Sequence, residues 1–496
     1  MAEVRKKTIL ATLLIYIGFA IGALNTWLFT HRGFFDVDQY GLTRVFNEMT
    51  LFIFSVSTMG INIVIYKFFP FYNRNLPEKE NDLLSGSLAW GTIGFLIVLF
   101  CGWLGHDLFI RKFATKSTML VEYYYWLFPC AYFLLLYTLA ESYAWQLHKA
   151  PFTNFLKEVL FRLITTVLII LYLKHVITFH EFMIGFALQY GIIFAALLYY
   201  LIIKQRVGLA LRFSRVTKKF YRKMLTMIGY VFIGNVIHAV GPVIGGIVIS
   251  SNNGLGAAGV YTFATYFGSI LQAPQRSISA LSVPILSNAW KDKDINGIRK
   301  VYQRSSINML IAAIFLFFII WLNYNNAINA FHINESYLDG KPVFLLIGLY
   351  WIIDMGTGVN AQIMTTSNHW RFEFSTSVLF VLLMIPTNYF LIKKMGITGA
   401  ACAQLISILI YNIVRIIFLW KKYNLLPFTV NTLKLIAISL CAYGVTYLIS
   451  SNITGFTGMF ITTIVFSVMF LVPVFLLDIT PDIKPVVATI KKRLSR

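Results

Sequence analysis

Charged residues are scarce in this chain of 496 residues. Only 12% are Asp, Glu, Lys or Arg, whereas 58% are hydrophobic. So few polar side chains cannot cover a water-facing surface, and apolar runs of about 20 residues recur along the chain. The composition therefore predicts an all-α, polytopic membrane protein.

Cysteines and chemical motifs are also few. Cys101, Cys130, Cys402 and Cys441 all lie inside apolar runs without paired or metal-like spacing, so we expect small core residues and neither a disulfide nor a zinc framework. The sequence shows no nucleotide-binding loop, metal cluster or catalytic triad. No predicted connection leaves room for a catalytic domain. We expect no cofactor, no metal and no enzymatic activity.

Windows of about 20 residues predict fourteen membrane spans. They cover 8–30, 44–68, 85–109, 122–146, 158–175, 182–203, 226–250, 259–286, 306–325, 342–366, 375–392, 398–419, 432–450 and 459–477. The first span is long and lacks a small-residue cleavage pattern, which favours a retained helix over a signal peptide.

Positive charge is distributed unevenly between the predicted connections. Most of the 42 Lys and Arg fall in the tails and in the loops of one side, so the positive-inside bias places both termini in the cytoplasm. The net charge is +22, and the basic residues lie between hydrophobic runs and are not gathered in a soluble domain. It indicates an anionic membrane face as the partner, and no nucleic acid.

The most basic connection divides the spans into six and eight. We predict an N-lobe at 1–203, a basic cytoplasmic linker at 204–225, a C-lobe at 226–419, two further helices at 432–477 and a basic cytoplasmic tail at 478–496. A weak internal sequence repeat, in which Gly41 aligns with Gly259, is consistent with two related lobes.

The eighth predicted span carries polar residues in its middle. Gln272, Gln275, Arg276 and Ser279 are spaced at i, i+3, i+4 and i+7, so they share one face of a helix that Pro274 is expected to bend. Exposure of Arg276 to lipid at mid-bilayer would cost about 2.5–3.5 kcal/mol. We therefore expect it to face protein or water, as part of a binding site or of a structural ion pair.

Three other spans contain ionisable residues. In the second, Arg44, Glu48 and Asn62 follow one helical face, and Arg44 with Glu48 could form a simple i,i+4 pair. In the tenth, Asp354 and Gln362 share a stripe, and Asp354 needs a partner or a proton. The candidate partners of Asp354 are Arg276 and Arg415. The latter lies in the twelfth span, near enough to the cytoplasmic end to snorkel.

Two more residues lie near helix ends. Arg32 closes the first span, where it serves either as an interfacial anchor or in function. Glu141, toward the cytoplasmic end of the fourth span, is a candidate for ion coupling together with Asp354 and Glu48.

Three stretches carry a family resemblance: 29–70 ("FTHRGFFDVDQYGLTR…"), 256–294 ("GAAGVYTFATYFGSILQAPQRS…") and 387–428 ("TNYFLIKKMGITGAACAQ…"). They resemble the oligosaccharide flippase branch, the lipid-linked O-antigen type, of the multidrug/oligosaccharidyl-lipid/polysaccharide (MOP) exporter superfamily. By position Arg32 matches the arginine that commonly closes the first span. Gly33-Phe34-Phe35 stands here in place of the usual leucine-glycine.

The resemblance implies two pseudo-symmetric, MATE-like six-helix lobes with two helices added. It implies a bacterial inner-membrane monomer that carries a polyprenyl-pyrophosphate-linked glycan outward by alternating access, for surface polysaccharide or lipopolysaccharide synthesis. Membrane lipids, and glycosyltransferases or a polymerase of the same pathway, are the implied partners. We expect Arg276 to bind pyrophosphate. The candidate substrate-binding residues are Arg276, Gln272, Gln275, Arg32, Arg44, Asn62, Gln362 and Arg415.

Two alternatives come from other classes. A multidrug or organic-cation exporter shares the two-lobe plan, but a cationic drug favours an acidic cavity and the first span contains no Asp or Glu. A membrane glycan polymerase needs a sizeable domain with convergent acids, for which the predicted loops are too short.

Overall fold

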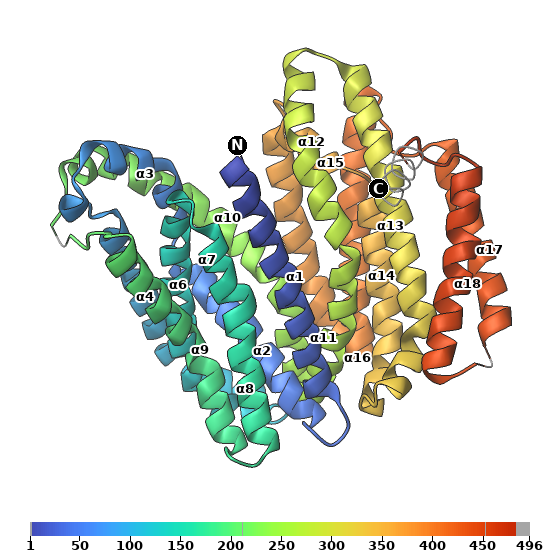
Figure 1. Ribbon diagram of the computed structural model, residues 1–496, viewed down its shortest axis with the longest axis horizontal. Helices are drawn as coiled ribbons and strands as arrows, with labels where there is room; N and C mark the ends of the chain where they lie inside the picture. Colours follow the sequence, from blue (N-terminus) through green and yellow to red (C-terminus); the bar gives the residue numbers. More distant parts are fainter. Residues whose placement is uncertain (1, 211, 452, 483–496) are drawn as a thin grey trace. The chain divides into compact units, whose positions relative to one another are not determined.

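The computed structural model describes residues 2–210, 212–451 and 453–482, and these residues form helices without a β-strand (Figure 1). The all-α prediction is confirmed. By length and composition, eight of the described helices can each cross a membrane, or nine spans result if the bent pair α2 (Val37–Ser57) and α3 (Asn62–Asn75) counts as one. The number fourteen stays a prediction, although each predicted span falls on helical segments.

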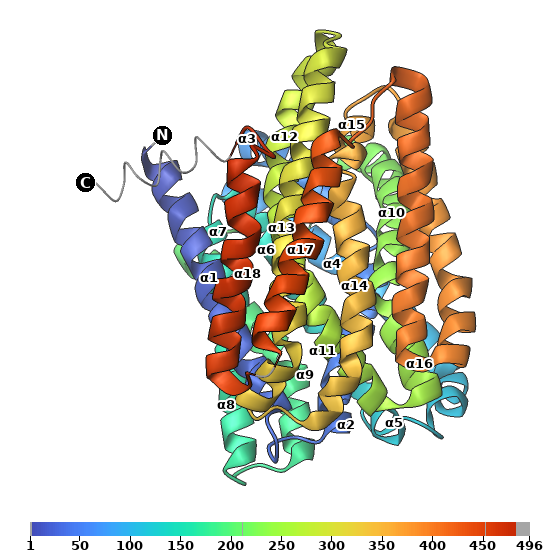
Figure 2. The ribbon, with the colours of Figure 1, turned by 90° about the vertical axis from the view of Figure 1, so that its right-hand side faces the viewer.

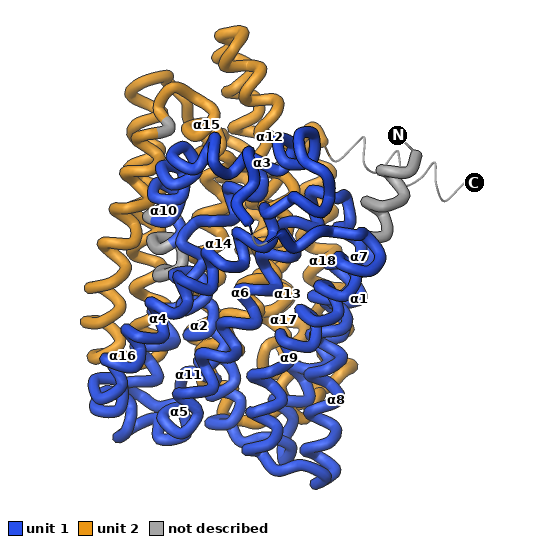
Figure 3. The backbone as a smooth tube through the Cα atoms, turned by 90° about the vertical axis from the view of Figure 1, so that its left-hand side faces the viewer, with its two compact units in different colours: residues 1–259 blue, residues 260–496 orange. Residues whose placement is uncertain are grey.

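The chain divides into two compact units, residues 1–259 and 260–496 (Figure 3). This division lies beyond the basic linker that was predicted to separate the lobes. The reason is that α10 (Arg215–Asn253) packs along α2 and α3 and so belongs to the first unit. The six-helix lobes and their symmetry remain predictions.

The first unit is organised around α6 (Leu127–Gln146). Besides α2, α3 and α10, this unit contains α1 (Ala2–Thr30), α4 (Leu83–Phe113), α8 (Phe161–Leu173) and α9 (Phe179–Tyr199), and the short α5 (Thr118–Glu122) and α7 (Ala150–Asn154). Helix α6 packs on α9, α2 and α4. Its apolar window is 78% buried, against 22% for that of α1. A helix that is apolar on all sides is stable where neighbours surround it, which places α6 at the core of the unit.

Two glycines allow α2 to approach the first turn of α11 (Leu255–Leu271). A methyl group on Gly41 would overlap the carbonyl oxygen of Leu255, and Gly259 meets Gly41 across the contact. Nearby, the Gly256 amide donates to Asp38 Oδ1 at 2.6 Å. The two glycines that the sequence sets against each other are thus in direct contact, as small residues at a close helix crossing are.

The second unit packs around α13 (Ile295–Ala330). It also contains α12 (Ala273–Lys291), α14 (Lys341–Gly356), α15 (Asn360–Thr365), α16 (Trp370–Tyr423), α17 (Val430–Ser450) and α18 (Gly455–Leu476) (Figure 2). Helix α13 contacts α12, α14, α17 and α18. Phe466 and Phe470 of α18 stack on Phe315 of α13. The last two helices are therefore fixed to this unit by an apolar cluster on α13.

Several predicted spans are broken. Helices α2 and α3 meet at an angle of 50°, with Gly60 at φ 78° between them. The predicted eighth span consists of two helices that meet at Gln272. Pro274 lies in the first turn of α12, where the missing N–H has no helical partner to lose. It therefore does not bend one long helix, as the sequence had led us to expect. Gly358 separates α14 from α15, and Gly396 (φ 59°) divides α16 into two arms.

The glycine crossing gives a stability prediction. Gly41→Leu places a side chain where the α11 backbone lies, so we expect destabilisation by about 1–3 kcal/mol or more, seen as a lower unfolding temperature in detergent. Gly105→Leu on α4 is the matched control, because a methyl group there meets no atom within 4 Å. Equal unfolding temperatures for the two variants would contradict the crossing.

Candidate functional site

The break between α14 and α15 is held by side chains of α13. Ser306 Oγ donates to the carbonyl oxygen of Gly356 at 2.5 Å, and the Val359 amide donates to Ser305 Oγ at 3.3 Å. Gly358 itself has φ 68°, a conformation that favours glycine. These bonds occupy backbone groups that the interruption leaves without helical partners, which is what allows a break at membrane depth.

Asp354 lies on α14 just before this break, with an amide on each oxygen. Gln275 Nε2 donates to Oδ2 at 2.7 Å, and Asn412 Nδ2 donates to Oδ1 at 3.1 Å. Of the two candidate partners, Arg415 interacts with Asp354 through its charge, but among the described residues neither Arg276 nor Arg415 is a direct hydrogen-bond partner. Within the described residues, this carboxylate is hydrogen-bonded by neutral groups and has no ion pair.

Hydrogen bonds continue from Asp354 along α15 and α16. Asn412 Oδ1 accepts from Thr357 Oγ1 at 3.1 Å and from Asn360 Nδ2 at 2.9 Å. Asn360 Oδ1 in turn accepts from Arg415 Nη1 at 3.4 Å. Asp354 and Arg415 are therefore connected through two asparagines.

Arg415 ends this chain of contacts in a buried ion pair with Glu373. Only 3% of Arg415 and 8% of Glu373 is exposed. The Arg415 guanidinium also donates to the Tyr411 hydroxyl and lies 3.6 Å from the centre of that ring. The interpretation of Arg415 as a snorkelling residue is wrong, because the second arm of α16 turns it into the helix packing.

We call this set the α14–α16 network. Its members are Gln275, Asp354, Thr357, Asn360, Glu373, Tyr411, Asn412 and Arg415. Sequence reasoning missed Glu373, because it precedes the predicted eleventh span and resembles an ordinary residue of a cytoplasmic loop. It also missed Asn412, although the polar pair Tyr411-Asn412 inside an apolar run was a usable signal.

The predicted polar face of the eighth span divides into two parts. Gln275 turns into the α14–α16 network, whereas Arg276 is exposed and donates from Nη2 to Gln272 Oε1 at 2.8 Å. Gln362 is half-buried and has no side-chain hydrogen bond among the described residues, so it lies outside the network.

In the first unit the predicted Arg44–Glu48 ion pair does not form within the described part of the chain. The Arg44 guanidinium carbon lies 4.8 Å from the ring centre of Tyr40 and 5.5 Å from that of Phe29. Glu48 Oε2 is buried without a hydrogen-bond partner, against Gly246 of α10. Aromatic faces attract the cation, and within the described residues this carboxylate oxygen interacts with Arg44 only through its charge, without a hydrogen bond.

The remaining candidates are dispersed. Asn62 opens α3, and its Oδ1 is buried without a partner in the described chain. Arg32 is exposed in the connection between α1 and α2. Glu141 is 2% exposed and pairs with Lys157 at 3.2 Å. Among the residues that the structure describes, no cluster of three His, Cys, Asp or Glu could hold a metal.

Solved structures share this arrangement of helices. The chain is similar to the lipid II flippase MurJ in an inward closed conformation, with a TM-score of 0.73 and 16% identity over 95% of this chain and 99% of that one. The protein has the fold of a MOP-superfamily transporter. The chain is also similar to a multidrug resistance MATE family transporter of that superfamily in an inward-facing conformation. The TM-score is 0.63 and the identity is 12%, over 83% of this chain and 94% of that one.

A third structure, of a MOP superfamily transporter from Pyrococcus furiosus, gives a TM-score of 0.54 and 12% identity over 85% of this chain and 96% of that one. A scan against protein-family models finds no match, and a search of the curated proteins finds none. At these identities the likeness establishes the fold, and the activity has to be argued from the chain itself.

The buried pair gives a second stability prediction. Glu373→Leu leaves the Arg415 guanidinium buried without a counter-charge, so we expect a loss of about 3–5 kcal/mol, measured as the unfolding free energy in detergent. Glu373→Leu combined with Arg415→Met removes both charges and should recover most of that loss. A double variant no more stable than the single one would show that the pair does not couple.

Proposed function

We propose that this protein is a flippase that moves a polyprenyl-pyrophosphate-linked oligosaccharide from the cytoplasmic to the outer leaflet by alternating access, without altering it chemically. The observation that carries the proposal is the fold shared with a lipid II flippase over 95% of the chain. The multidrug transporter covers less of the chain, 83%, and with a lower TM-score.

Arg276 supplies the charge that a diphosphate requires. Its guanidinium is exposed and bonded to the neutral Gln272, so its positive charge is not consumed by an acid, as that of Arg415 is. Charge-assisted bonds from a guanidinium to phosphate oxygens are strong and geometrically selective. Sugar hydroxyls would need polar partners in place of water, and Gln272 is a candidate in the second unit.

Asp354 is the best candidate for the coupling ion. Both of its oxygens accept hydrogen bonds from neutral amides, and among the described residues it forms no direct ion pair. An ionisable group at membrane depth without a direct ion pair is suited to take up a proton or a small cation during the cycle. Glu48, whose buried oxygen has no partner, is the corresponding candidate in the first unit. Glu141 is already neutralised by Lys157, which weakens its case.

The cellular setting follows from charge and from the substrate class. We propose a monomer in a bacterial inner membrane with both termini in the cytoplasm, acting in surface polysaccharide or lipopolysaccharide synthesis of the O-antigen type. Enzymes that build or polymerise the glycan would supply and consume its substrate. The segments 204–223 and 291–304, which include the connections between α9 and α10 and between α12 and α13 and the adjoining helix ends, carry many of the basic residues that support this orientation.

A multidrug exporter is the second candidate, because the fold is also that of a MATE family transporter. The two functions require opposite charge in the binding site. Binding of organic cations by the purified protein, together with no effect on a lipid-linked glycan, would favour the exporter.

Transport should depend on Arg276. We expect Arg276→Leu to lower flipping of the lipid-linked glycan at least about tenfold, because a charge-assisted bond to phosphate is lost, while Arg276→Lys keeps part of the activity. The measurement is accumulation of the lipid-linked glycan in the cytoplasmic leaflet of cells that carry each variant. Arg111→Leu on α4, an equally exposed arginine, is the control. Normal export by an inserted Arg276→Leu protein would overturn the cation site.

Ion dependence should depend on Asp354. Asp354→Asn keeps the shape of the side chain and removes its charge, so we expect transport to lose its response to the proton or sodium gradient, with phosphate-ligand binding retained. Flux in proteoliposomes under imposed gradients measures this. A variant with an unchanged gradient response would exclude Asp354 from coupling.

A further inference from the structure

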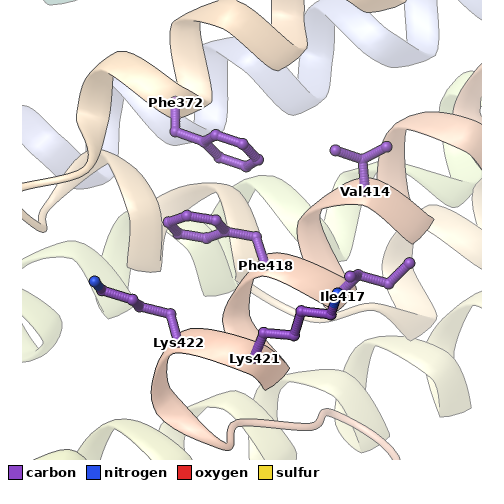
Figure 4. Close-up of a pocket in the computed structure, with 6 residues that line it drawn as sticks. All are labelled: Phe372, Val414, Ile417, Phe418, Lys421 and Lys422. Atoms are coloured by element: carbon purple, nitrogen blue, oxygen red, sulfur yellow. The ribbon is translucent and has the colours of Figure 1, made fainter.

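A groove with an unusual combination of charges and aromatic rings lies on the second unit. It has a volume of about 390 Å³ and lies between the two arms of α16 (Figure 4). Its lining residues are Phe372, Val414, Ile417, Phe418, Lys421 and Lys422. The volume is in the range of small-ligand sites, roughly 300–1,000 Å³.

The floor of this groove is apolar and ordered. Phe372 and Phe418 stack with their ring centres 4.0 Å apart, one from each arm of α16. Val414 is half-buried beside them, whereas Ile417 is 43% exposed. The two arms together form a surface that suits a hydrocarbon chain more than a polar ligand.

Both charges of the groove are positive and at one end. Lys421 and Lys422 occupy the last turn of α16, are exposed, and have no ion pair among the described residues. The nearby acid on the first arm, Glu373, is buried and already paired with Arg415. The loop charges of the sequence predict that this end of α16 lies at the cytoplasmic surface.

A second groove of similar size provides a contrast. It has a volume of about 370 Å³ and is lined by Leu96, Leu99, Phe100, Trp103, Tyr124, Tyr125 and Phe128 of the first unit. None of these residues is charged. Apolar grooves of this kind accept lipid chains without selecting a headgroup, so the lysine pair distinguishes the groove on α16.

We propose that the groove on α16 is a binding site for an anionic phospholipid of the cytoplasmic leaflet. One acyl chain lies on Phe372, Val414, Ile417 and Phe418, and the phosphate lies at the end of the groove where Lys421 and Lys422 extend to opposite sides. Each basic residue near the membrane surface increases the affinity for anionic lipid by about tenfold or less. An apolar groove beside such residues binds the acyl chain and so holds the lipid at this position. This site is separate from the proposed transport site at Arg276 and does not depend on it.

The test uses the purified full-length protein in a neutral detergent. Dioleoylphosphatidylglycerol and dioleoylphosphatidylcholine, which share the same chains, are titrated separately, and bound lipid is counted by native mass spectrometry. We expect at least about tenfold tighter binding of the phosphatidylglycerol. Lys421→Gln with Lys422→Gln should abolish this preference. Glycerol phosphate without chains should not compete at the same concentrations.

A matched control comes from the same helix. Lys393 and Lys394 form an adjacent, exposed pair at the end of the first arm of α16, away from the lining residues of the groove. Lys393→Gln with Lys394→Gln should leave the preference unchanged. Val414→Trp fills the groove but keeps Lys421 and Lys422, and it should weaken binding of the phosphatidylglycerol at least about tenfold.

Several results would overturn the proposal. These are equal binding of the two lipids by the unaltered protein, a preference that survives loss of Lys421 and Lys422, and unchanged binding in the Val414→Trp variant. Competition by glycerol phosphate would also overturn it, since the site would then bind the anion without the lipid. All the variants change groove-lining or exposed residues of a well-packed helix, and monodisperse elution confirms that each one is folded.

Discussion

Hydrocarbon offers no hydrogen bonds to a polypeptide, and this constraint governs where the helices of the protein can be interrupted. The break after α14 occurs where Ser305 and Ser306 of α13 reach the freed backbone groups of Val359 and Gly356. The break after α2 occurs at Gly60, which contacts the α10 backbone. Both of these interruptions therefore lie against a neighbouring helix, α13 in the one case and α10 in the other.

The same low-polarity surroundings explain the α14–α16 network. Arg415 cannot remain charged and buried alone, so it is paired with Glu373 and bonded to Asn360 and Tyr411. Asp354 lies at the other end, bonded by amides and without a direct ion pair in the part of the chain that the structure describes. The end with Arg415 and Glu373 is thus electrically neutral, whereas the end with Asp354 is not. Two asparagines, Asn412 and Asn360, connect Asp354 with the arginine of α16 by hydrogen bonds.

Three polar features of the second unit lie in different surroundings. Arg276 is exposed and retains its charge, the network is internal, and the groove of Lys421 and Lys422 lies outside the network. This separation is consistent with a transporter that must bind an anionic lipid-linked substrate, respond to an ion and remain in contact with membrane lipid. The fold shared with a lipid II flippase provides the scaffold in which these tasks are proposed to be combined.

The sequence by itself determined the fold class, because 58% hydrophobic residues in runs of about 20 leave helices in a membrane as the physical solution. It also identified Asp354, Arg415 and Arg276 as unusual, since ionisable residues in such runs are costly. The tertiary structure alone decided their partners. Glu373 and Arg415 are 42 residues apart, and no helical periodicity relates residues on different arms. Gln275 and Arg276 are adjacent in the chain, yet packing half-buried one at Asp354 and left the other exposed, because a helix turns successive side chains by about 100°.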